Sequence, residues 1–250
     1  MRKLQLIIFM FSFIILITIS LININSAGAG TICSSYSNLP WHQLSIGVIS
    51  CNKKISSCAE DNCQDMLDIF EKCENLSAEL TKVDGPSKDT ILYLLNSKNI
   101  ECINIALINI LLREIFSKDI LDNILELQNV NADIFANNAI NQTLNKLDAK
   151  HVIEYKDKIL RNLKNKSDYD WYILSIMPTL EKIPQDDIFE VYANLLRKNN
   201  KAIRLAVYLT IRKYGSEYIN KVKEILTKEG DNDALLFLNN PVGLGGSTRE

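Results

Sequence analysis

Apolar residues recur at helical spacing in successive segments between residues 100 and 230. In one segment Ile219, Val222 and Leu226 follow one another at intervals of three and four. Residues with that spacing share one face of a helix, whereas a half-buried strand would alternate at every second residue. The pattern therefore predicts a series of amphipathic helices.

One hexapeptide recurs where these segments end. Its copies read LLREIF at 111–116, TLNKLD at 143–148, TLEKIP at 179–184 and TIRKYG at 210–215, at intervals of 32, 36 and 31 residues. A second apolar segment begins about four residues after each copy. Because a pair of short helices cannot bury its apolar face alone, repeated pairs are expected to stack. The predicted fold class is all-α, a short α-solenoid of stacked antiparallel helix pairs.

Proline, glycine and aspartate mark the joints between the helices. Pro184 cannot continue the helix that it follows, and Gly215 lies where a helix usually ends. Asp168 or Asp170 is expected to cap the helix that follows it. Pro178 lies inside a predicted helix and should bend its axis.

On this spacing and these joints, the chain resembles the HEAT-like class of helical repeats over about residues 100–230. The asparagine and arginine pattern within each HEAT unit is not evident here. The resemblance implies a curved stack whose second helices line a concave groove and bind another protein. The polar candidates for that groove are Glu154, Lys158, Arg161, Asn194, Arg197 and Lys221.

Two more helices, joined near residues 59–61, are predicted ahead of the repeats. They form a hairpin that would cover the apolar end of the stack. The six cysteines allow fifteen connectivities, and the hairpin favours a nested one. It joins Cys51 to Cys73, Cys58 to Cys63 and Cys33 to Cys102. The hairpin is thus expected to be stapled by disulfides.

The first 29 residues have the layout of a secretory signal. A positive start, MRK, precedes a long apolar run and the small-residue exit NINSAGAG, with cleavage expected after Ala27 or Ala29. An uncleaved anchor is the alternative, since the run is about long enough to span a bilayer. Either way residue 30 onward is predicted to be exported, to the periplasm or extracellular space, or to a lumen in a eukaryote. The even number of cysteines, all beyond residue 30, also favours export.

The predicted organisation has four parts. They are a signal or anchor at 1–29, a disulfide-rich helical cap at 30–99, helical repeats at 100–230, and a capping helix with a tail at 231–250.

Charge is unevenly distributed along the chain. Residues 30–148 contain 9 basic and 16 acidic side chains, whereas residues 149–230 contain 16 and 11. Such a split can steer a charged partner. Nucleic acid is not expected as that partner, because the chain is predicted to be exported and is acidic overall. Membrane contact is expected only through the N-terminal segment, if it is uncleaved.

Residues that carry chemistry are sparse. The two histidines, His42 and His151, lie near no recognisable nucleophile, and the spacing of zinc hydrolases is missing. The closest acidic pairs, at 168 and 170 and at 186 and 187, fall where helices begin, which capping explains. We therefore predict no catalytic, cofactor-binding or metal-binding residues, and no cofactor.

The favoured hypothesis is an exported, non-enzymatic module that binds a protein partner in a helical groove. For a bacterial source, its narrower form is an envelope immunity protein or inhibitor. The alternatives are a hydrolase or lyase with carboxylates gathered in the groove, and a carrier of lipid or peptide.

Overall fold

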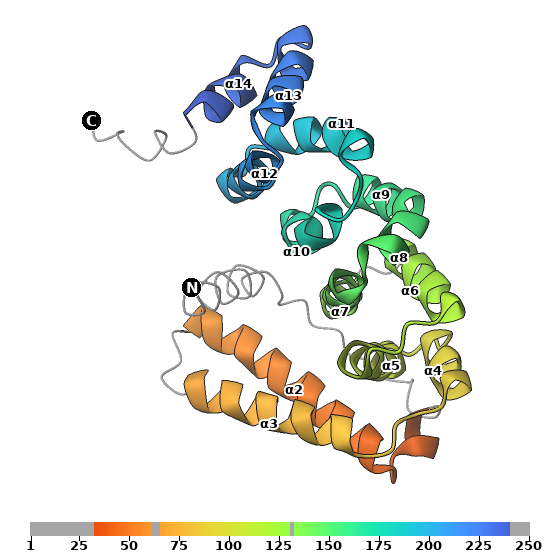
Figure 1. Cartoon of the computed structure of the whole chain (residues 1–250). Helices are drawn as coiled ribbons and strands as arrows, with labels where there is room; N and C mark the ends of the chain where they lie inside the picture. The colour runs from red at the N-terminus through yellow and green to blue at the C-terminus, as the bar shows by residue number, and fades with distance from the viewer. Residues whose placement is uncertain (1–32, 62–65, 131–132, 241–250) are drawn as a thin grey trace. The chain divides into compact units, whose positions relative to one another are not determined.

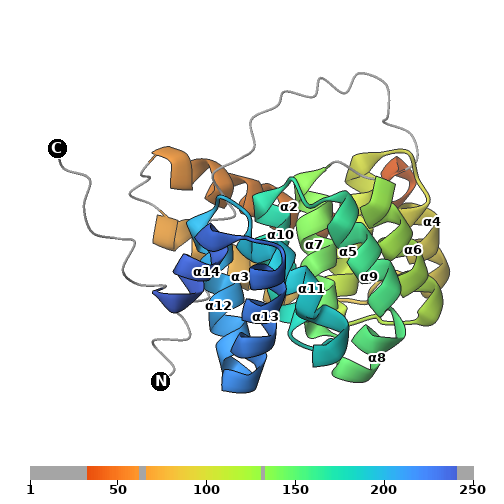
Figure 2. The same cartoon turned by 90° about the horizontal axis from the view of Figure 1, so that it is seen from above.

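The computed structural model describes residues 33–61, 66–130 and 133–240, and all regular structure in these ranges is helical (Figures 1 and 2). The predicted all-α fold of stacked helix pairs is therefore confirmed. Contacts divide the chain into two units, residues 1–147 and residues 148–250. Each unit is described separately below.

The first unit combines a hairpin with two helix layers. Its elements are η1 (Cys33–Tyr36), α2 (Pro40–Asp61), α3 (Met66–Lys82), α4 (Lys88–Leu95), α5 (Ile100–Arg113), α6 (Lys118–Val130) and α7 (Ile134–Lys146). The hairpin of α2 and α3 packs against α5, while α4 and α6 form one layer against α5 and α7 (Figure 1). The predicted boundary at 99/100 thus falls between α4 and α5, two helices that pack together.

The second unit, taken by itself, also has two layers of helices. Its helices are α8 (Ala149–Glu154), α9 (Lys156–Asn165), α10 (Asp170–Leu180), α11 (Gln185–Leu196), α12 (Lys201–Lys213), α13 (Ser216–Lys228) and α14 (Asn232–Asn239). α11 packs beside α13, α10 packs beside α12, and α12 contacts both α11 and α13. α14, the short last helix expected from the sequence, packs against α13.

Short polar side chains begin six of the described helices. The oxygen of each accepts a hydrogen bond from a backbone N–H of the first turn, as when Asp133 Oδ1 accepts from Ala136 N at 2.7 Å. Such a bond satisfies a donor that has no partner within the helix. The residues with this role are Ser87, Asn99, Asp133, Asp148, Asn200 and Asp231.

Helix α10 begins differently from the prediction. Its N-cap is Tyr169, which makes no side-chain capping bond, so neither Asp168 nor Asp170 caps it. Asp170 is already inside the helix, where its Oδ2 accepts a hydrogen bond of 2.7 Å from Asn200 Nδ2 at the start of α12. The capping prediction was wrong here because the carboxylate joins two neighbouring helices instead. Pro178 does lie inside α10, as predicted.

The recurring hexapeptide marks contacts from one repeat to the next. Lys146 Nζ, in the second copy, donates to Leu111 O and to Glu114 Oε1 of the first copy, both at 3.0 Å. Lys213 Nζ, at the same position of the fourth copy, donates to both carboxylate oxygens of Glu181 in the third copy at 2.8 Å. The lysine recurs because each joint reaches back to an acceptor in the preceding joint.

The third and first copies of the hexapeptide also contact an earlier part of the chain. Lys182, in the third copy, interacts electrostatically with Asp148 at the end of the second copy. Arg113, in the first copy, has no earlier copy to reach, and it donates to the carbonyl oxygens of Leu80 and Val83 where α3 ends. The first copy therefore ties the hairpin to the stack.

Other ion pairs also span about one repeat, with partners 29 to 32 residues apart. They are Lys88–Asp119, Lys156–Asp187, Arg197–Glu229 and Arg204–Asp233. The sequence period is thus carried by polar contacts as well as by the apolar core.

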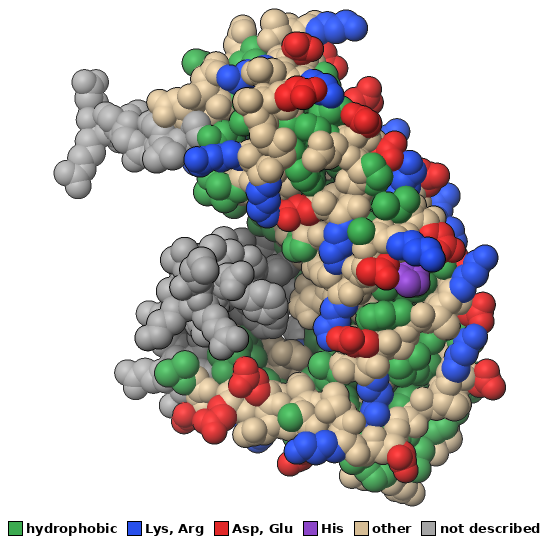
Figure 3. Space-filling model, in the orientation of Figure 1, with side chains coloured by type: hydrophobic (Ala, Val, Ile, Leu, Met, Phe, Trp, Pro, Cys, Tyr) green, Lys and Arg blue, Asp and Glu red, His purple; other side chains and the backbone are tan. Residues whose placement is uncertain are grey.

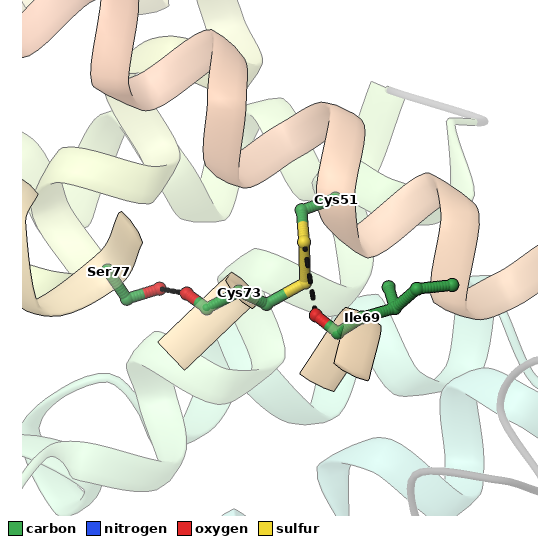
Figure 4. The surroundings of a disulfide bond; sticks show 4 residues. All are labelled: Cys51, Ile69, Cys73 and Ser77. Atoms are coloured by element: carbon green, nitrogen blue, oxygen red, sulfur yellow. Dashed lines mark hydrogen bonds between the residues drawn. A yellow bond between two sulfur atoms is a disulfide. The ribbon is translucent and has the colours of Figure 1, made fainter. Parts of the chain in front are cut away.

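A disulfide joins the two arms of the hairpin (Figure 4). Cys51 on α2 bonds to Cys73 on α3, with a Cα–Cα distance of 5.6 Å. The half-buried side chains of Ile69, Phe70 and Leu76 surround it. This is one of the three predicted pairs.

The other two predicted pairs are not fully described. Cys102, on α5, is disulfide-bonded. The side chains of Cys33, Cys58 and Cys63 lie outside the described part of the structure, so the pairs Cys33–Cys102 and Cys58–Cys63 stay predictions.

Candidate functional site

The six predicted groove residues are spread over four helices of the second unit. Glu154 ends α8, Lys158 and Arg161 lie on α9, Asn194 lies on α11, Arg197 follows α11 as its C-cap, and Lys221 lies on α13. Glu154, Arg161 and Asn194 are exposed, and the others are half-buried.

Arg197 and Asn194 are brought together, but in a structural joint. Arg197 Nη1 donates to Asn194 Oδ1 at 2.6 Å. The same guanidinium pairs with Glu229 and lies 3.4 Å from Asp231, so it links α11 to the end of α13. A partner would have to compete with these carboxylates for Arg197.

Lys221 is also engaged within the unit. Its Nζ lies 5.2 Å from the ring centre of Phe189 and 3.4 Å from Glu217 Oε1. Phe189 in turn stacks on Tyr218, with ring centres 4.3 Å apart. This lysine covers an aromatic pair, an arrangement that stabilises both cation and rings.

Helix α12 carries a surface that the sequence reasoning missed. Its inner face buries Ile203, Val207 and Ile211, as the helical period requires. Two more leucines, Leu205 and Leu209, lie on another face and remain 43% and 48% exposed.

Cations stand at both ends of these leucines. Lys201 is one turn before Leu205, and Arg212 is one turn after Leu209, and both side chains are exposed. We call Lys201, Leu205, Leu209 and Arg212 the α12 surface. In Figure 3, hydrophobic side chains emerge beside Lys and Arg side chains over α12. The leucine spacing of four residues was the sequence signal, but the stronger buried pattern of the same helix obscured it.

The described carboxylates with shifted pKa values are exposed and paired. A hydrogen bond from Lys88 lowers the pKa of Asp119, and bonds from the backbone and ring of His151 lower the pKa of Asp148. Both groups are thus held in the charged form, whereas a general acid at neutral pH needs a raised pKa. Among the described residues, no three His, Cys, Asp or Glu side chains are grouped to hold a metal ion.

Two open depressions lie on single helices of the described structure. One, of about 360 Å³, lies on α3 and is lined by Asp68, Glu71, Lys72, Asn75, Leu76 and Glu79. The other, of about 520 Å³, lies on α13 and is lined by Asn220, Lys223, Glu224, Thr227 and Lys228.

His42 is a buried residue of α2. Its side chain is 4% exposed, neither ring nitrogen has a hydrogen-bond partner in the described structure, and burial lowers its pKa. A buried polar chain begins one turn further along α2. Ser45 Oγ accepts a hydrogen bond of 2.8 Å from Asn109 Nδ2. Asn109 Oδ1 in turn accepts a hydrogen bond of 3.1 Å from Arg113 Nε.

Within the described ranges no helix combines the length and apolar character needed to cross a bilayer. The predicted signal or anchor at 1–29 lies outside those ranges.

Comparisons of the chain with protein-family models, with curated proteins and with solved structures found no match.

Proposed function

We propose that the chain is an exported protein that binds a protein partner and catalyses no reaction. For a bacterial source, the narrower proposal is an envelope immunity protein or inhibitor. The observation that carries the proposal is the α12 surface, where two leucines about half exposed stand between Lys201 and Arg212. Apolar anchors enclosed by polar side chains are typical of the centre of a protein interface.

Export is supported by two independent features. The layout of residues 1–29 resembles that of a signal segment, and a disulfide such as Cys51–Cys73 is typical of proteins in oxidising compartments. The binding partner is accordingly expected in the envelope, outside the cell, or in a lumen.

The surface proposed here differs from the groove suggested by the HEAT-like resemblance. Two of the groove candidates, Arg197 and Lys221, already contact carboxylates of their own unit. Breaking such pairs would oppose binding at those two residues. The exposed side chains of Leu205 and Leu209, which gain from being covered, make the α12 surface the better first choice. Arg161, which is exposed on α9, keeps the groove hypothesis testable.

Binding is tested by affinity purification of the tagged full-length chain after its export. Wild-type protein is expected to recover a stoichiometric partner, and the double variant Leu205→Glu/Leu209→Glu should reduce recovery at least about tenfold, the effect of losing a central anchor. Leu236→Glu is the matched control, because Leu236 is an exposed leucine on α14. Arg161→Glu tests the groove in the same experiment.

Two outcomes would count against the proposal. Recovery that is unchanged by the α12 double variant would exclude the α12 surface. The absence of any stoichiometric partner with every variant, including an untagged copy of this chain expressed alongside the tagged one, would reject the binding function.

Mass spectrometry of the exported chain should find a mature N-terminus just after Ala27 or Ala29.

A further inference from the structure

The charges of the α12 surface have a defined spacing. Lys201 and Arg212 are 11 residues apart, which is about 17 Å along a helix. Leu205 and Leu209 project between them on the same face. A complementary surface would need an apolar recess with carboxylates about 17 Å apart.

Helix α3 offers such a surface. Its open depression has the half-buried Leu76 in its lining, together with the carboxylates of Asp68, Glu71 and Glu79. Asp68 and Glu79 are also 11 residues apart, so they span the same length of about 17 Å. Lys72 is the one cation in this lining.

We propose that the α12 surface of one copy docks on the α3 depression of a second copy of this chain. The inference rests on the proposed function and names the partner of the same surface. Leu205 or Leu209 enters the depression against Leu76, and the terminal cations meet the terminal carboxylates. Because the two surfaces are different, the contact is heterologous, and it leaves one unused surface on each outer copy.

The charge distribution of the whole chain favours this pairing. Residues 30–148, which contain α3, have 9 basic and 16 acidic side chains, and residues 149–230, which contain α12, have 16 and 11. Opposite net charges raise the rate at which the two surfaces meet, and salt weakens that attraction.

The test is sedimentation velocity of protein purified from full-length expression, over a range of concentrations. We expect self-association with a Kd of about 1–100 µM, the weak end for a small interface. It should weaken about tenfold or more between about 50 mM and about 500 mM NaCl, because the paired charges are exposed. A chain that stays monomeric up to about 100 µM in low salt would overturn the proposal.

Complementary variants distinguish a heterologous contact from a symmetric one. The first, Leu205→Glu/Leu209→Glu, disables the α12 surface, and the second, Asp68→Lys/Glu79→Lys, disables the α3 surface. Each should be monomeric alone, whereas their mixture should form dimers and nothing larger, since only one good contact remains. Mixtures that stay monomeric, or single variants that still associate, would contradict the pairing.

Controls distinguish loss of self-association from misfolding of the variants, and self-association from binding of a different protein. All four substituted positions are exposed, so circular dichroism should be unchanged. Leu236→Glu should associate like wild type. If the chain is monomeric but still recovers a different protein through α12, the second copy is rejected while the proposed function stands. If α12 variants change neither assembly nor recovery, both are rejected.

Discussion

At the scale of single residues, His42 is a titratable side chain in a buried site that, within the described structure, offers it no hydrogen bond. It lies on α2 beside Trp41, with ring centres 5.7 Å apart, and it is buried with both nitrogens unbonded. Burial disfavours the charged imidazolium, and the nearby Glu101 offsets this only in part. The folded state therefore holds His42 neutral.

His42 should make the fold sensitive to acid. Because its pKa is lowered in the folded state, the unfolded chain binds the proton more readily, and stability is lost as pH falls below about 6.5. One pKa unit of depression corresponds to about 1.4 kcal/mol. Urea unfolding at pH values between 7.5 and 5 should show this loss in wild type, and His42→Leu should reduce it.

His151 provides the control for this experiment. It is the only other histidine, and it is partly exposed beside Asp148. His151→Gln should therefore retain the acid-dependent loss of stability that wild type shows. Equal pH profiles for wild type and His42→Leu would mean that the buried imidazole is not responsible.

At the scale of elements, the joints should differ in strength according to burial. Arg113 is half-buried, and it satisfies carbonyl oxygens at the end of α3 as well as Asn109. Arg113→Ala should cost about 2–3 kcal/mol, because it leaves buried acceptors without a donor. Lys213→Ala breaks an exposed pair with Glu181 and should cost about 1 kcal/mol or less. Denaturant midpoints of the two variants compare them directly, and equal losses would refute the burial argument.

The hairpin disulfide should matter more than an exposed joint. Cys51 and Cys73 are 22 residues apart, and closing a loop of that size restricts the unfolded chain. A Cys51→Ser/Cys73→Ser variant should lose about 2–4 kcal/mol. Thermal melts of this variant and of wild type, both without reductant, would measure the difference. A variant as stable as wild type would show that helix packing alone holds the arms together.

Helices were predictable from the sequence because their signal is local. The apolar period and the effect of Pro178 depend on residues within a few turns of one another. The start of α10 was not predictable in the same way, because Asp170 bonds to Asn200, which is 30 residues away. Capping rules describe one helix at a time and cannot anticipate a partner in another.

At the scale of the whole molecule, the surface was harder to predict than the fold. The groove candidates were chosen as polar residues on second helices, and two of them serve repeat-to-repeat contacts or cover aromatic rings. Leu205 and Leu209 were missed because an apolar residue in an amphipathic helix is normally assigned to the core. Only the burial of Ile203, Val207 and Ile211 reveals that the two leucines lie outside it.

The lysine joints also limit how such a chain can change in length. Lys146 and Lys213 each meet an acid 32 residues earlier, so each bond depends on the number of residues between the two positions. Removing half a repeat would place the lysine opposite the wrong helix, whereas adding or removing a complete repeat would restore every acceptor. Insertions and deletions between these joints are therefore expected to keep the lysine bonds only when they add or remove a complete helix pair.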